Sequence, residues 1–223
     1  MATWGAHLRI ADILYDKLDN TKISPIEFVV GNIAPDSGVP DPNDPTKYNP
    51  SKTVSHFESS APHSFDYDTY AGQFFAKEQQ KTYSKEAYSF YLGYLTHLIA
   101  DFAWTDFIYN PLKERDIENY TVSKVEATWK WKKDWYDLDH KFFRDNPSFR
   151  TLEIYRSAEG FDNVYLDFFS RTAFDERRKF IVEFYSNHPS DLEREYTWTT
   201  EEDMENFIKY AVGFIVKELE KFI

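Results

Sequence analysis

At 223 residues the chain is long enough to bury one sizeable hydrophobic core, and we expect a single domain over residues 1–223. Hydrophobic residues make up 42% of the chain and aromatic residues 19%, which excludes a disordered protein, and the lack of cysteine excludes disulfides and thiolate metal sites. The formal charge of -12 argues against non-specific binding to nucleic acid or to an anionic membrane surface, because such binding needs Lys and Arg.

The N-terminal stretch MATWGAHLRIADILYDKL does not have the pattern of a signal peptide. It lacks a basic n-region, and Arg9, Asp12 and Asp16 interrupt its apolar run. No run of about 18 apolar residues is present that would span a membrane. A cytoplasmic location is therefore the expectation.

The first predicted elements are two helices followed by a loop. Apolar residues at spacings of three and four predict an amphipathic helix over residues 4–18. Pro25 marks the start of a second helix over residues 25–33, which ends before Pro35. Residues 35–53 hold five prolines and predict a long irregular loop, a kind of segment that often serves function.

The rest of the chain has helical periodicity. Residues 85–108 are apolar nearly all round and predict a central buried helix. Further helices are expected over residues 70–78, 121–143, 163–186 and 199–222. No β-strand alternation of useful length and no repeat is present, so the fold class is all-α.

The stretch YLGYLTHLIADFAW, within the central helix, raises a question of chemistry. Its polar residues His97 and Asp101 are four positions apart and so project from one helical face. Gly93 precedes His97 by one turn and is expected to leave space where a ligand could approach. A metal site and a purely structural hydrogen bond between the two side chains are both open at this point, because either would offset the cost of burying them.

Three further residues occupy similar settings. His7 lies on the apolar face of the first helix, Asp36 follows a helix end, and His56 opens a short segment after the proline-rich loop. Taken singly, each has an ordinary structural explanation. Together with His97 and Asp101 they supply three imidazoles and two carboxylates, which is enough for a pair of metal ions with open positions for water and substrate.

Four motifs in this order, TWGAHLRIAD, GNIAPDSG, SHF and GYLTHLIAD, resemble the zinc-dependent phospholipase C family. That family is itself similar in fold to the zinc nucleases of the S1/P1 type. The matching segments run from Thr3 to about Trp104. The resemblance implies a single helical bundle that holds one to three zinc ions, with two expected here.

The resemblance also implies roles for the five residues. His56, His97 and Asp101 would hold one zinc ion, with Asp36 at its edge as a ligand or general base. His7 would bind a second zinc ion, and Asp101 would bridge the two.

Two departures from the family pattern concern the remaining ligands. In the secreted enzymes the second zinc ion is also held by the amino group of an N-terminal Trp, whereas Trp4 is not terminal here. The third zinc site uses an H-x-x-x-E pair, whose nearest analogue is Trp135-x-x-x-Asp139. Asp139 has aromatic helical neighbours and needs a partner, which would be a metal, a Lys or Arg, or a backbone donor. His140 and Asp106 are weaker candidates.

The leading hypothesis is a metal-dependent phosphoric ester hydrolase, with zinc activating a water molecule that attacks a phosphodiester. Asp36 would orient or deprotonate that water. Substrate choice would come from the loop at residues 37–55 and from aromatic walls formed by Trp104 and Trp135. The substrate would be a small phosphodiester or a phospholipid headgroup.

A second hypothesis is a helical binding or regulatory protein that keeps a structural metal site but has no turnover. The missing third site and N-terminal ligand favour it. The HD-type phosphohydrolases are a third all-α class, but they need an adjacent His-Asp doublet that this sequence lacks. The other histidines have ordinary explanations, His63 on a loop surface and His188 at a helix end.

Overall fold

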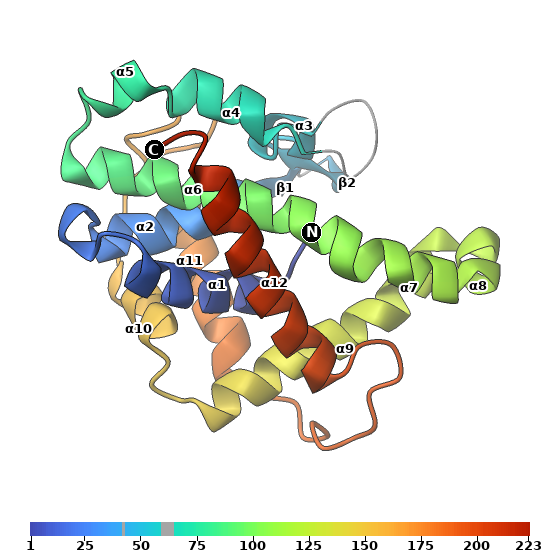
Figure 1. Ribbon diagram of the computed structural model, residues 1–223. Helices are drawn as coiled ribbons and strands as arrows, with labels where there is room; N and C mark the ends of the chain where they lie inside the picture. The colour runs from blue at the N-terminus through green and yellow to red at the C-terminus, as the bar shows by residue number, and fades with distance from the viewer. Residues whose placement is uncertain (42, 59–64) are drawn as a thin grey trace.

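The computed structural model describes residues 1–41, 43–58 and 65–223, so His63 lies outside the described residues. It confirms the all-α fold: helices supply nearly all of the regular structure in these ranges, beside a two-stranded hairpin (Figure 1). The helices are α1 (Trp4–Lys17), α2 (Pro25–Ile33), α3 (Lys52–Ser55), α4 (Tyr67–Phe74), α5 (Lys77–Gln80), α6 (Lys85–Trp104), α7 (Asn110–Arg115), α8 (Ile117–Val122), α9 (Lys124–Asp145), α10 (Arg150–Ser157), α11 (Ala173–Ser186) and α12 (Glu201–Leu219). The hairpin strands are β1 (Val39–Asp41) and β2 (Asp44–Asn49), and short 3-10 turns lie at Asn20–Lys22 and Ala34–Asp36.

The central helix is α6, as its apolar sequence predicts. It begins at the cap residue Ser84, whose side chain accepts a hydrogen bond from the Ala87 amide, and it is buried along most of its length. Helices α1, α2, α4 and α12 pack against it, and Figure 1 shows α12 crossing it. Neither α6 nor any other helix in the described part of the chain is long and apolar enough to cross a membrane, which agrees with the sequence.

Two glycines set the distance between α2 and α6, which make the most extensive helix contact in the fold. A Cβ atom on Gly31 would lie 2.2 Å from the carbonyl oxygen of Phe90, and one on Gly93 would lie 2.2 Å from that of Phe28. The backbones therefore meet where only hydrogen atoms fit. The prediction that Gly93 leaves room for a ligand is wrong, because the backbone of α2 fills that space.

The helix predicted over residues 163–186 begins only at Ala173. The Asn163 side chain accepts hydrogen bonds from the amides of Tyr165 and Leu166 and donates to the carbonyls of Leu166 and Phe169. These local bonds give the backbone an alternative to the helical ladder. Residues 163–172 consequently form turns.

The predicted loop over residues 35–53 contains the hairpin, with Val39 opposite Asn49 and Pro40 opposite Tyr48. The strands are too short for an alternation of apolar and polar residues to be recognised in the sequence.

The predicted helix over residues 85–108 ends as an α-helix at Trp104 and continues as a π-helical turn. Helix α10 was not predicted from the sequence.

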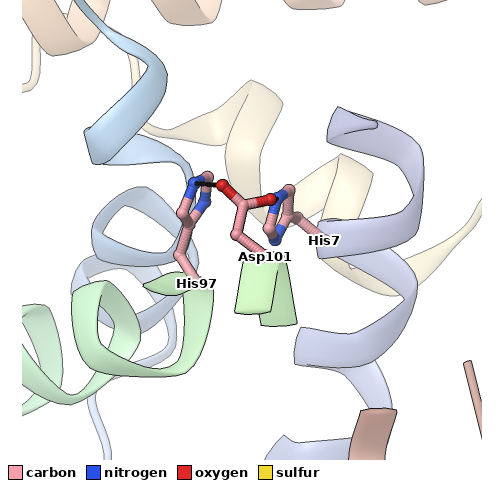
Figure 2. Close-up of side chains that lie close together, drawn as sticks. All are labelled: His7, His97 and Asp101. Carbon is pink, nitrogen blue, oxygen red and sulfur yellow. Dashed lines mark ion pairs between the residues drawn. The ribbon is translucent and has the colours of Figure 1, made fainter. Parts of the chain in front are cut away.

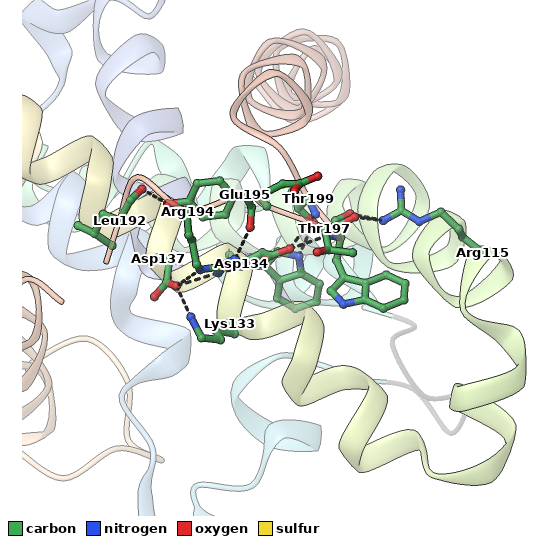
Figure 3. Close-up of polar contacts among 12 residues, drawn as sticks. Arg115, Lys133, Asp134, Asp137, Leu192, Arg194, Glu195, Thr197 and Thr199 are labelled. Atoms are coloured by element: carbon green, nitrogen blue, oxygen red, sulfur yellow. Dashed lines mark hydrogen bonds and ion pairs between the residues drawn. The ribbon is translucent and has the colours of Figure 1, made fainter. Parts of the chain in front are cut away.

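A polar network fixes α9 to the segment that precedes α12 (Figure 3). Arg194 forms ion pairs with Asp134 and Asp137, at 2.7 and 2.8 Å. The Trp198 amide donates to Asp134 at 2.6 Å, and the Trp135 indole donates to the Thr199 hydroxyl at 2.9 Å. The network thereby holds the Trp135 ring in one orientation.

The α2–α6 crossing generates a prediction about stability. We expect Gly93→Ala to lower the free energy of unfolding by about 1–3 kcal/mol, because the added methyl group overpacks two backbones that cannot separate freely. Gly213→Ala on α12 is the matched control, since a Cβ atom there meets no atom within 4 Å and alanine favours a helix. Urea unfolding measures both, and equal stability of the two variants would contradict the close crossing.

Candidate metal centre

Five side chains from four parts of the chain meet beside α6. His97 and Asp101 lie on α6 itself, and His7 comes from α1. Asp36 ends the 3-10 turn after α2, and His56 follows α3. His7, His97, Asp101 and His56 are at most 1% exposed, so the group is buried except near Asp36.

His97 is oriented by α2. Its Nδ1 lies 2.7 Å from the carbonyl oxygen of Asn32 and donates a hydrogen bond to it, which leaves Nε2 free. That Nε2 lies 3.4 Å from Asp101 Oδ2 (Figure 2). Neither atom has a hydrogen-bond partner among the described residues, so the alternative of a structural His97–Asp101 hydrogen bond does not satisfy the pair.

His56 is oriented in the same manner. Its Nδ1 lies 2.9 Å from the Ser55 hydroxyl, and its Nε2 lies 3.2 Å from Asp36 Oδ1 and 3.7 Å from Asp101 Oδ2. The next residue, Phe57, has a φ of 51°, in the left-handed region that a bulky residue rarely adopts. Such strain is found at sites where the surrounding packing dictates a side-chain direction.

His7 lies on the other side of Asp101. Its Nε2 is 3.4 Å from Asp101 Oδ1, and its ring stacks on that of His97 with the centroids 3.8 Å apart (Figure 2). The Ala2 amide donates to the same Oδ1 at 2.6 Å. Asp101 thus directs one oxygen toward His7 and the other toward His56 and His97.

The ligand atoms of this centre form two groups that could hold a metal ion. One contains His7, His97 and Asp101, and the other contains Asp36, His56 and His97, with the ligand atoms of each within 4.8 Å of one another. Both ring nitrogens of His7, the Nε2 atoms of His56 and His97, and Asp101 Oδ2 are buried without a hydrogen-bond partner in the described structure. Burying so many unsatisfied polar atoms in one place is costly, and a metal ion of the zinc type would satisfy them.

The protonation states of both carboxylates, His7 and His56 suit metal binding, while His97 would release a proton on binding a metal ion. Burial tends to raise the pKa of Asp36 and of Asp101. The contact with His56 and the charge of His97 outweigh it for Asp36, and the N-terminal amino group and His97 outweigh it for Asp101, so both pKa values lie below the usual range. Burial lowers the pKa of His7 to about 4, and it also lowers the pKa of His56. The pKa of His97 is raised, because the charge of Asp101 outweighs the effect of burial. At neutral pH the carboxylates are ionised and His7 and His56 are neutral, as metal ligands must be.

Asp36 and His56 also border a cavity of about 750 Å³. Its walls include Trp4, Trp129, Trp135 and Tyr136, with further residues from the β1–β2 hairpin and α11. The metal-ligand group of Asp36, His56 and His97 therefore lies beside a space that a small molecule could enter. Trp135 lines this cavity, and its expected contact with the substrate stays a prediction.

The structure places Trp104 elsewhere. It is fully buried against Trp135 and Phe207, with ring centroids 5.0 and 4.8 Å away, and it does not line the cavity. The prediction that Trp104 contacts the substrate does not fit this position, because the Trp104 side chain packs against α12 and not into the cavity. The indole fills the core between α6, α9 and α12.

Asp139 is also outside the two metal-ligand groups. Its Oδ2 accepts a hydrogen bond from the Tyr185 hydroxyl at 2.7 Å, and that hydroxyl accepts one from the Gly5 amide at 2.9 Å. Burial raises the pKa of Asp139 to about 6. Its partner is a tyrosine, which the sequence did not suggest. Of the weaker candidates, His140 packs on Phe184 and Asp106 is exposed.

Two residues that orient the ligands were not identified from the sequence. Asn32 supplies the carbonyl for His97, and Ser55 supplies the hydroxyl for His56. The signal at Asn32 was a polar residue within the apolar run FVVGNIA. Its side chain is itself fixed, because its amide donates to Thr96 at 2.9 Å.

The fold and site define an all-α protein with buried His and Asp groups that could bind metal beside a cavity. The chain belongs to the zinc-dependent phospholipase C family, whose sequence profile, described as zinc dependent phospholipase C, matches residues 6–158. The resemblance predicted from the motifs is confirmed, and the matched span contains all five residues of the centre. No curated protein and no solved structure is similar enough to the chain to count as a match.

The shared position of His97 generates a prediction about metal binding. We expect zinc to raise the melting temperature of the wild-type protein, because a ligand that binds only the native state stabilises it. His97→Ala removes a ligand atom from both candidate groups, so it should lose most of this shift and at least one bound zinc ion. His188→Ala, at an exposed position, is the control and should keep both. Thermal unfolding with elemental analysis gives the answer, and equal zinc stabilisation of His97→Ala would contradict the assignment.

The buried Asp139 generates a prediction about pH. Its pKa of about 6 lies above the value of 3.8 for an unperturbed group, so between these values the native protein binds a proton that the unfolded chain does not. Its contribution to stability therefore falls as the pH rises from about 4 to 6. We expect Asp139→Asn, which carries no charge, to be more stable relative to wild type at pH 7 than at pH 4.5. Urea unfolding at both pH values measures this difference, and a difference that does not change with pH would rule out a raised pKa.

Proposed function

We propose that the protein is a zinc-dependent phosphoric ester hydrolase of the phospholipase C type, which uses water to cleave a phosphodiester. The observation that carries the proposal is the set of five buried ligand atoms without hydrogen-bond partners in the described residues, next to a cavity. Membership of a zinc-dependent family supports zinc as the metal.

Two zinc ions fit the donor set. His56, His97 and Asp101 would hold one of them, with Asp36 at its edge, and His7 would hold the other. The two carboxylate oxygens of Asp101 point to opposite sides and so suit a bridging role. His97 has one free nitrogen and would therefore serve a single ion.

A bound zinc ion supplies Lewis acidity, which lowers the pKa of water and stabilises negative charge on phosphoryl oxygens. Asp36 is ionised, belongs to one metal-ligand group and borders the cavity, so it can accept the proton of the attacking water. The water oxygen then forms the new bond to phosphorus, and the alcohol leaves with a proton. Trp135, held by Thr199, would position the substrate as part of the wall.

The substrate is a small phosphodiester or a phospholipid headgroup. The cavity volume of about 750 Å³ suits a ligand of this size, and its aromatic walls suit the apolar part of such an ester. Trp104 has no part in this proposal because it lies in the core.

A binding or regulatory protein with a structural metal site is the second candidate. Asp139, the nearest analogue of a ligand to the third zinc ion, bonds to Tyr185 instead. Loss of that site is the observation that favours a protein without turnover. Zinc would then stabilise the fold while no phosphodiester is cleaved.

Substitution of Asp36 separates the two candidates. If Asp36 is the general base, Asp36→Asn should lower kcat on a soluble phosphodiester by at least about 100-fold while most of the zinc stays bound. Asp106→Asn is the matched control, because Asp106 is an exposed carboxylate outside the centre. A zinc-loaded wild-type protein without turnover on a panel of phosphodiesters would favour the binding protein.

A further inference from the structure

The cavity next to the metal-ligand group is lined by basic residues, although the chain as a whole has a net charge of -12. Lys52 follows the hairpin, Lys124 and Lys132 lie on α9, and Arg177 lies on α11. Three separate parts of the fold thus bring positive charge to one space. The carboxylates on the same lining are those of Asp36 and Glu176, and Glu176 accepts a hydrogen bond from Thr172 at 2.6 Å.

None of these four basic side chains forms an ion pair with a carboxylate of residues 1–41, 43–58 or 65–223. The remaining residues, Pro42 and 59–64, include no Asp or Glu in the sequence. Several basic residues elsewhere are paired, as Arg150 is with Asp12 and Asp16. The cavity thus brings four cations together in one space without an ion-pair partner among the described residues.

Lys132 and Arg177 are held in place by aromatic rings. Lys132 Nζ lies 5.0 Å from the ring centroid of Trp129, and the Arg177 guanidinium lies 5.6 Å from those of Trp4 and Phe180. Arg177 also donates to the Gly38 carbonyl at 2.7 Å, while its buried Nε has no partner in the described structure. Both cations are thus positioned before any ligand binds.

The charges also affect one another. Burial lowers the pKa of Lys132, and the positive charge of Lys52 adds to this effect, while Asp36 opposes it. Two lysines near each other and near the metal-ligand group repel, and a bound anion would remove that repulsion. A cationic substrate group such as a quaternary ammonium would be repelled by both lysines. The Trp4 and Trp129 rings that could bind it are already occupied by Arg177 and Lys132, respectively.

We propose that Lys52, Lys132 and Arg177 bind a second anionic group of the substrate, so that the preferred phosphodiester carries a further phosphate or carboxylate on one of its alcohols. This inference rests on the proposed function. The cavity would therefore prefer an anionic alcohol group on the phosphodiester, whereas an enzyme for choline esters prefers a cationic one. The same chemistry would serve a lipid headgroup or a free phosphate ester.

The test compares dihexanoyl phosphatidylglycerol with its terminally phosphorylated form and with dihexanoyl phosphatidylcholine, using zinc-loaded full-length protein. We expect kcat/KM for the phosphorylated ester to exceed that for either other ester by at least about tenfold, mainly through KM. Lys132→Gln and Arg177→Gln should each remove most of this preference while phosphatidylglycerol turnover changes little. Lys130→Gln is the matched control, since Lys130 lies on α9 and does not line the cavity.

Deacylated forms of the same esters separate the two sources of substrate. A preference that persists without acyl chains assigns it to a soluble phosphate ester, and one that needs them assigns it to a lipid. Turnover of phosphatidylcholine at an equal or higher rate, or an unchanged preference in both variants, would overturn the inference and leave the proposed function standing.

Calorimetric binding of glycerol 1,3-bisphosphate and glycerol 1-phosphate tests the inference without turnover. The bisphosphate should bind at least about tenfold more tightly to the wild-type protein, and this advantage should be lost in Lys132→Gln. If no ester is cleaved, the proposed function fails while this result still supports an anion site. Equal affinities for the two phosphates would overturn the anion site itself.

Discussion

The hydrogen bond from His97 Nδ1 to the Asn32 carbonyl connects the packing of the fold to the chemistry of the centre. It forms because Gly31 and Gly93 let α2 and α6 approach until their backbones touch. The bond leaves the free Nε2 of His97 facing Asp101, one helical turn further along. Asp36, which follows α2, is placed by the same crossing. A change in the distance between these two helices would therefore change both ligand groups together.

The features that depend on short-range helical geometry could be predicted from the sequence. His97 and Asp101 share a helical face because they are four residues apart. Two polar residues within an apolar helix are also easy to recognise in the sequence. The meeting of His7, Asp36 and His56 at that face was not visible in the spacing; it was inferred from their similar settings in the sequence and from the family resemblance. The single-domain organisation and the cytoplasmic location stay predictions.

The features that depend on tertiary packing were predicted less well. Whether Gly93 faces a ligand or another helix, and whether Trp104 faces a cavity or the core, is decided by elements distant in the sequence. Asp139 has the aromatic surroundings that the sequence indicates, but Tyr185 comes from another helix. Residues 163–172 avoid a helix because one asparagine side chain competes for the backbone.

The centre and the cavity give a consistent physical account. Buried ligand atoms without partners in the described structure need a cation, and unpaired lysine and arginine side chains nearby need an anion. A metal ion and a phosphate ester satisfy both needs at once. The basic lining contrasts with the net charge of -12 of the chain as a whole.

Anomalous diffraction at the zinc absorption edge, from crystals of the zinc-loaded protein, would locate the bound metal. We expect one anomalous peak among His56, His97 and Asp101 and a second between His7 and the other oxygen of Asp101. Zinc bound only at other residues, such as the neighbouring His140 and His188, or no peak at this centre, would contradict this assignment.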